Sequence, residues 1–232
     1  MENVEIIKER NTAIIDGIKI THIGHASIKI TTPENKIIYF DPYAYPEKGY
    51  EEKANLVFIS HEHFDHCAPE IIKKIAVEGK TKIIAHPNCQ SKLLDIKAEK
   101  MFLMPGDKRE IDGISLEVVH AYNQSKPFHP KGSGNGYVIK LNNLSLYHPG
   151  DTDVIDEMKE LKGKVDVFFC PISGTYVMDE KDALKAIEYI CPSIVIPIHY
   201  NYLEGLEKDP YKFKQAAREK FGDDVEVIVL IE

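Results

Sequence analysis

One short segment, Ile59–Cys67, narrows the possible folds of this chain more than any other. It reads "ISHEHFDHC" and directly follows the apolar run "NLVF", a pattern typical of a buried strand that ends in a polar cluster. Histidine has only an intermediate tendency to be buried, and carboxylates are almost never buried unless they are paired. Such a cluster is therefore either a chance accumulation or a metal site, and the rest of the sequence must distinguish the two.

Apolar periodicity predicts a chain in which groups of strands are followed by helices, twice over. The runs typical of strands lie at 18–24, 26–32, 36–42, 55–60, 81–86, 113–122, 136–143, 144–151, 165–171, 193–200 and 225–231. Helical spacing occurs at 69–79, 88–97, 178–190 and 210–221. This order predicts an α/β protein with two packed sheets and helices outside them, in one domain that spans residues 1–232.

The cluster itself can present donors to two neighbouring ions. His61 and His63 are two residues apart, so in an extended segment their side chains point the same way. Asp65 and His66 follow at the turn into the helix and can face a second ion. Imidazole nitrogen and carboxylate oxygen suit Zn²⁺, Mn²⁺ and Fe²⁺, and no cysteine among these donors imposes a strong preference for zinc.

Further candidate donors lie at the ends of other predicted strands. They are His120, Asp151 and His199. Open α/β sheets gather their ligands at the carboxyl ends of strands, so these side chains are expected to meet the cluster. Gly150 precedes Asp151 and predicts a tight turn from which the carboxylate reaches between two ions.

These residues together resemble the metallo-β-lactamase fold superfamily. The matching motifs are Asp41 in "YFDP", H-x-H-x-D-H at His61–His66, His120 in "VVHAY", Asp151 in "PGDT" and His199 in "PIHY". They occur in the order of the family and cover residues 20–200. The segments "THIGHAS" and "IPIHYNY" further resemble the branch of small hydrolases that includes the L-ascorbate-6-phosphate lactonase. The resemblance implies a four-layer αββα sandwich with a dinuclear metal site between the sheets.

Carried over by position, the resemblance implies a ligand set for each of two divalent ions. The first ion is expected to bind His61, His63 and His120. The second is expected to bind Asp65, His66 and His199, with Asp151 bridging the two ions. We expect zinc, with manganese or iron compatible.

Two aspartates are expected to act beside the ions. Asp41 is expected to orient a ligand histidine through a hydrogen bond. Asp65 is the expected catalytic residue. Two cations favour the formation of a metal-bridging hydroxide near neutral pH, and Asp65 would hold this hydroxide and then relay its proton. This predicts a metal-dependent hydrolase that acts on a small, anionic ester, lactone or phosphoester.

Substrate choice is expected to depend on the rim of the site, because the ligands are committed to the ions. The expected substrate-binding residues are His25, His129 and Tyr200, together with the irregular loop 123–136. That loop also carries Lys126 and Lys131, which could meet an anionic group. A solvated loop without substrate contact is the alternative.

Other functions were weighed against this hydrolase. A phosphodiesterase or nuclease on the same fold is the nearest alternative, but the formal charge of −8 and the lack of a basic run argue against nucleic acid. Oxidoreductase chemistry is another alternative, because flavin-linked relatives carry a di-iron site. The lack of a flavodoxin-like extension in this sequence argues against it. A non-catalytic metal-binding protein would be expected to lack a ligand, whereas every ligand position is filled.

Composition places this small-molecule enzyme in a reducing compartment. The four cysteines are widely spaced and show no C-x-x-C motif, which favours buried thiols over disulfides and thus the cytoplasm. The first eleven residues mix acids with bases and predict no signal peptide, and no apolar run is long enough for a membrane span. The oligomeric state is open.

Overall fold

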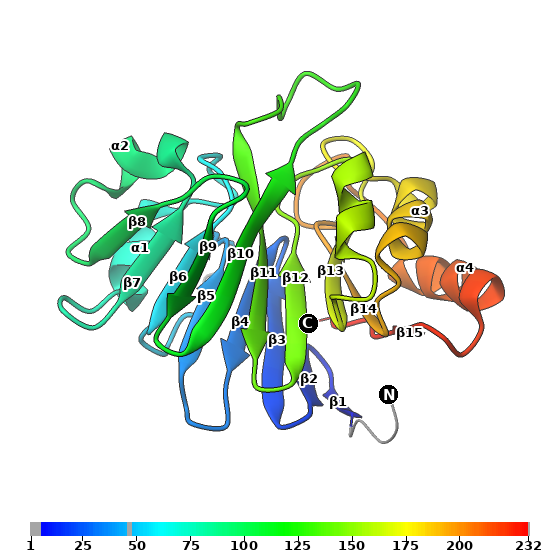
Figure 1. Cartoon of the computed structure of the whole chain (residues 1–232), viewed down its shortest axis with the longest axis horizontal. Coiled ribbons are helices and arrows are strands. Elements are labelled where there is room, and N and C mark those ends of the chain that lie inside the picture. Colours follow the sequence, from blue (N-terminus) through cyan, green and yellow to red (C-terminus); the bar gives the residue numbers. More distant parts are fainter. Residues whose placement is uncertain (1–5, 46–47, 232) are drawn as a thin grey trace.

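The computed structural model describes residues 6–45 and 48–231, and it contains two β-sheets packed face to face (Figure 1). The first sheet follows the chain in the order β1 (Ile6–Glu9), β2 (Thr12–Ile15), β3 (Ile18–Gly24), β4 (Ser27–Thr31), β5 (Ile37–Phe40), β6 (Leu56–Ile59), β7 (Lys82–Ala85) and β8 (Glu99–Phe102). In the second sheet, neighbouring strands also follow one another in the chain. From one edge to the other they are β15 (Glu226–Val227), β14 (Ile194–Ile198), β13 (Val167–Pro171), β12 (Leu144–His148), β11 (Gly134–Leu141), β10 (Ile114–Ala121) and β9 (Lys108–Ile111).

Helices cover the outer face of each sheet (Figure 1). Those beside the first sheet are α1 (Pro69–Ile75), the short 3₁₀ helix η1 (Pro87–Cys89) and α2 (Gln90–Leu93). Those beside the second sheet are η2 (Asp156–Leu161), α3 (Glu180–Ile190) and α4 (Pro210–Phe221). The expected αββα class is confirmed.

Three buried clusters hold these layers together. The central one joins the inner faces of both sheets, with side chains such as Ile28 and Phe58 of the first sheet and Ile139 and Phe169 of the second. Burial of apolar surface is the main favourable term in folding, so this shared core fixes how the sheets face one another. Two outer clusters pack α1 and α2 on one side and α3 and α4 on the other.

Each sheet changes from antiparallel to parallel pairing partway across, and this change positions the site. β5, β6, β7 and β8 pair in parallel, as do β12, β13, β14 and β15. The carboxyl ends of parallel strands lie at one edge, so the segments that follow β5, β6, β12 and β14 are brought together. The polar motifs of the sequence follow these four strands.

The structure differs from the predicted elements at several places. β1, β2, β8 and β9 are additional strands, and the helix expected at 88–97 is shortened to η1 and α2. The chain leaves α2 after Leu93 and buries Ile96, so tertiary packing overrides the helical spacing. The last strand covers only Glu226–Val227, although Ile228 still donates its N–H to Val195.

The cysteines are free thiols. Cys67, Cys89 and Cys170 are buried, as expected, whereas Cys191 is exposed. Within the described ranges, none of the helices is long and apolar enough to cross a bilayer. Part of the predicted absence of a signal peptide rests on residues 1–5, which lie outside the described residues.

Candidate metal centre

Sharp turns after the strands aim the polar side chains at one place. Asp41 after β5, His199 after β14 and His25 between β3 and β4 have φ angles of 43°, 59° and 53°. Left-handed backbone is uncommon for residues other than glycine, and it persists where the surroundings hold it. Gly150, also left-handed, makes the turn that leads from β12 to Asp151.

The turns create three overlapping groups of metal-binding donors. Their members are His61, His63 and His129 in the first; His25, Asp65, His66 and His199 in the second; and His61, His66 and Asp151 in the third. In each group the donor atoms lie within 4.8 Å of one another. The groups share His61 and His66, so they form one continuous centre.

Asp151 lies at the middle of this centre. Its Oδ2 is 3.1 Å from Nε2 of His199 and 3.4 Å from Nε2 of His129. Its other oxygen, Oδ1, is 3.2 Å from Nε2 of His66. The carboxylate therefore contacts histidines of both the first and the second group.

A further set of hydrogen bonds fixes the ring orientations. Asp41 accepts hydrogen bonds from the backbone N–H of Ser60 at 2.7 Å and from its hydroxyl at 2.6 Å. The same carboxylate accepts from Nδ1 of His66 at 2.8 Å, which leaves Nε2 of that ring directed at Asp151. The Ser173 hydroxyl lies 3.1 Å from Nδ1 of His199. Such partners set the tautomer of a ligating histidine.

The buried atoms at the middle of the centre fit a bound cation. Nε2 of His66 and Oδ1 of Asp151 face each other, yet neither has a hydrogen-bond partner within the described part of the chain. If His66 is neutral with its proton on Nδ1, two lone pairs meet at this point. A divalent cation coordinated by nitrogen and carboxylate oxygen would relieve that repulsion, and this donor chemistry suits Zn²⁺, Mn²⁺ or Fe²⁺.

The ionisation equilibria of the centre also favour positive charge at this point. Burial would lower the pKa of His66, but Asp151, Asp65 and Asp41 together hold it well above its usual value. Burial would raise the pKa of Asp151, but His199 and His66 hold it well below its usual range. The centre thus has the electrostatics of a cation site: it retains a buried positive charge between carboxylates.

Three other histidines of the centre, His25, His61 and His129, have a lowered pKa and are therefore neutral near pH 7. Burial, followed by the neighbouring His66, lowers the pKa of His61 well below its usual value. Burial and His199 lower the pKa of His25 to about 4. Burial also lowers the pKa of His129. Neutral imidazole is the form that binds metal ions.

The structure brings six of the seven predicted ligand side chains together, and His120 is the exception. His120 belongs to none of the three groups, because it is still within β10, where it pairs with Asn135. It lines a different pocket together with Glu117, Glu157 and Glu160. His129, expected at the rim as a substrate residue, lies with His61 and His63 in its place.

The remaining rim residues also lie elsewhere than expected. His25 is fully buried, and its Nε2 is 3.0 Å from Oδ2 of Asp65, so it lies among the donors. Tyr200 is only 3% exposed and packs in the core beneath the second sheet, away from the cavity beside the centre. The two lysines of the loop have other partners: Lys126 pairs with Asp153 at 2.6 Å, and Lys131 with Glu157 at 2.7 Å.

A cavity of about 450 Å³ opens beside the centre. On one side it is lined by His63, Asp65, His129 and Asp151, and on the other by Phe64, Phe128, Tyr176, Leu203 and Glu204. The sequence interpretation missed this second wall, because it is assembled from four separate irregular segments. Of its members, only Phe128 lies in the loop singled out from the sequence.

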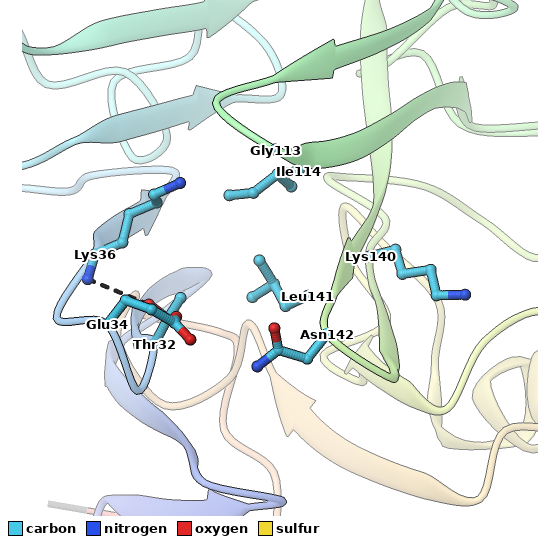
Figure 2. Close-up of a pocket in the computed structure, with 8 residues that line it drawn as sticks. All are labelled: Thr32, Glu34, Lys36, Gly113, Ile114, Lys140, Leu141 and Asn142. Atoms are coloured by element: carbon cyan, nitrogen blue, oxygen red, sulfur yellow. Dashed lines mark hydrogen bonds between the residues drawn. The ribbon is translucent and has the colours of Figure 1, made fainter.

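A second pocket, of about 220 Å³, lies at the other end of the strands (Figure 2). It is formed by three turns, which contribute Thr32, Glu34, Lys36, Gly113, Ile114, Lys140, Leu141 and Asn142. It holds no histidine and a single carboxylate, so its lining does not suit a catalytic metal.

The fold and the donors define a metal-binding domain of the β-lactamase superfamily, and comparison with known proteins agrees. Residues 19–199 match the family model of the beta-lactamase superfamily domain. The chain is 33% identical over 223 residues to a UPF0173 metal-dependent hydrolase of Thermococcus onnurineus, covering 92% of this chain and 96% of the relative. The chain therefore belongs to the UPF0173 metal-dependent hydrolases within that superfamily.

Solved structures agree with this assignment. A protein from Parabacteroides distasonis described as a metal-dependent hydrolase has a TM-score of 0.80 and 28% identity, and the match covers 99% of this chain and 100% of that one. Igni18, a metallo hydrolase from the hyperthermophilic archaeon Ignicoccus hospitalis, has a TM-score of 0.76 and 26% identity, with 92% and 95% covered. The expected class of enzyme, a metal-dependent hydrolase, is confirmed.

Proposed function

We propose that the chain is a dinuclear hydrolase whose two divalent ions lie on either side of Asp151. His61, His63 and His129 would hold one ion, and Asp65, His66 and His199 the other. The observation that carries this proposal is the position of Asp151, whose two oxygens lie within 3.4 Å of histidines from both groups. A bridging carboxylate needs that geometry.

Bound divalent ions would supply a nucleophile by lowering the pKa of coordinated water toward neutrality, and they would polarise the oxygen of an electrophile. Asp65 lines the cavity and is largely buried. Burial would raise its pKa, but the charge of His66 and the hydrogen bond from His25 keep it low, so Asp65 is a carboxylate at neutral pH. It can accept the proton of an attacking water at Oδ2 or Oδ1 and pass it on.

Zinc is the ion we propose first, because sites of nitrogen and oxygen donors bind it tightly. Manganese and iron are compatible with the same donors. The identity of the ion follows from metal analysis of protein purified without chelators.

The proposed substrate is a small ester, lactone or phosphoester. The cavity of about 450 Å³ has the size of a small-molecule site, and the segments that resemble the L-ascorbate-6-phosphate lactonase branch support a small substrate. The net charge of −8 argues against nucleic acid, and the widely spaced free cysteines support a cytoplasmic location.

Metal analysis combined with anomalous scattering tests this proposal. We expect two ions per chain, about 3.5–4 Å apart. A chelator should abolish hydrolysis of a panel of lactones, carboxylic esters, thioesters and phosphodiesters, and the metal should restore it. A centre that binds one ion and never a second would refute the bridging role of Asp151.

A further inference from the structure

The wall of the cavity opposite the centre is mainly apolar and aromatic. Phe64 and Phe128 are 62% and 42% exposed, although such side chains are normally buried. Phe128 packs edge-to-face on Tyr176, with ring centroids 4.7 Å apart, so these two rings support each other in the wall. Leu203 completes it. Exposed apolar surface that faces a catalytic cavity favours an apolar ligand.

The described part of this wall carries no positive charge. Among the described residues that line the cavity, none is a lysine or an arginine. The nearby candidates are occupied elsewhere, since Lys126 binds Asp153 and the carbonyl of Val177. Lys131 binds Glu157 and lies over the ring of Tyr122, 4.9 Å from its centroid. The side chains that were expected to bind an anionic group therefore point to other partners.

Within residues 6–45 and 48–231, the one charged side chain of this wall is negative. Glu204 is exposed and lines the cavity next to Leu203. A substrate whose remote end carries a carboxylate or phosphate would face this like charge and would find no cation to compensate it. Repulsion of a like charge is a common way of rejecting a wrong substrate.

We propose that the substrate is an uncharged carboxylic ester or lactone, with an apolar or aromatic group that packs against Phe64, Phe128 and Tyr176. This inference rests on the proposed hydrolase function and narrows its substrate class. The carbonyl reacts at the centre, while the apolar group remote from it meets the wall. Binding energy from that remote contact sets specificity.

Two esters that differ only at the end of the acyl chain test the proposal. In 4-nitrophenyl butyrate the chain ends in a methyl group, and in mono-4-nitrophenyl succinate it ends in a carboxylate. With metal-loaded protein we expect kcat/KM to be at least about tenfold higher for the butyrate, the discrimination that a single small group typically provides. A higher kcat/KM for the succinate, or for bis(4-nitrophenyl) phosphate, would overturn the proposal.

Variants of the wall show whether it causes the preference. Phe128→Ala and Tyr176→Ala should each raise KM for the butyrate ester by about tenfold. The same variants should change KM for the succinate ester by less than about twofold. Tyr176 does not adjoin a proposed ligand in sequence, so its variant separates substrate contact from any loss of metal, which is measured in parallel. Leu203→Lys should raise kcat/KM for the succinate. Leu94→Ala, which removes an exposed apolar side chain at the end of α2, is the matched control and should change neither ester.

Binding of a ketone separates this proposal from the hydrolase proposal. Butyrophenone cannot be hydrolysed, and calorimetry should show that metal-loaded protein binds it more tightly than 4-oxo-4-phenylbutanoate, with the difference reduced in Tyr176→Ala. If no ester is cleaved but this binding pattern holds, the substrate pocket is right and the hydrolase proposal is wrong. If esters are cleaved with an anionic preference, the hydrolase proposal stands and the pocket inference fails.

Discussion

Gly150→Ala is the substitution for which the structure predicts the sharpest combined effect on folding and on metal binding. Gly150 has a φ of 62°, and a Cβ added there would lie 2.7 Å from Cβ of Ser60 and 2.8 Å from the carbonyl oxygen of Asn135. The first atom belongs to the segment that leads to His61, and the second belongs to β11. Neither can move without disturbing the sheets on which the centre is built.

The expected cost follows from two contributions. Left-handed backbone costs a residue other than glycine about 1–2 kcal/mol. Forcing extra volume into a packed interior typically costs about 1–3 kcal/mol more. Gly150→Ala should therefore lower the free energy of unfolding by about 2–5 kcal/mol. Because Asp151 is the next residue, the bound metal should decrease as well.

Urea unfolding of metal-free protein, together with metal analysis of the loaded protein, measures both effects. Gly163→Ala is the matched control, since Gly163 has a φ of 69° but no atom within 4 Å of an added Cβ. It should lose only the backbone contribution, about 1–2 kcal/mol, and keep its metal. If the two variants lose the same stability, the close approach of Gly150 to Ser60 and Asn135 has no energetic importance, and the reasoning is refuted.

Three further predictions concern the centre. Asp151→Asn should keep the fold but reduce the metal content below two ions per chain, because an amide supplies no negative charge. His86→Ala lies outside the donor groups and should leave the metal content unchanged. Equal metal content in both variants would reject a bridging role for Asp151. His129→Ala should remove one ion and His120→Ala none, and the reverse result by metal analysis would restore the ligand set inferred from sequence. Metal-free protein should lose stability as the pH falls from about 6.5 to 4, because unfolded His25 takes up a proton near 6.5 and folded His25 only near 4. That difference in pKa is worth about 3 kcal/mol of unfolding free energy. In urea unfolding, the stability of His25→Gln should therefore depend correspondingly less on pH than that of the unchanged protein. An equal pH dependence in both proteins would contradict the shifted pKa of His25.

The sequence could predict the part of the centre that local patterns determine. His61, His63, Asp65 and His66 follow a buried strand within one short segment, so their proximity needs no knowledge of the tertiary structure. Asp151 and His199 also follow strands whose apolar runs are evident. The fold class was predictable for the same reason, since it follows from the order of strands and helices.

The proposed exchange of His120 for His129 in the ligand set depends on contacts that no periodicity encodes. Asn123 donates its N–H to the carbonyl of His129 at 2.7 Å, and its Oδ1 accepts from the N–H of His129 at 3.1 Å. The same oxygen lies 2.9 Å from Nδ1 of that ring. This irregular fold of the loop turns His129 back to the centre. A loop without repeating structure leaves no signal from which such a contact could be inferred.

The short helix α2 and the apolar wall of the cavity could not be predicted from the sequence for a related reason. α2 covers only four residues where helical spacing suggested ten, because the position of Ile96 in the core decides where the helix ends. The apolar wall of the cavity joins Phe64, Phe128 and Leu203 from three distant segments. Their proximity is a product of the assembled sheets, and the sequence shows them only as isolated apolar residues in loops.

The division of the donors between the two sheets has a consequence for the order of events during synthesis. When the ribosome has released the segment from His61 to His66, Asp151 and His199 have still to be made, and the strands that precede them, β12 and β14, both belong to the second sheet. Under the proposed function, no complete set of donors exists until most of the chain has emerged and both sheets have closed on their shared core. A complete set of donors for either proposed ion therefore forms only together with the second sheet.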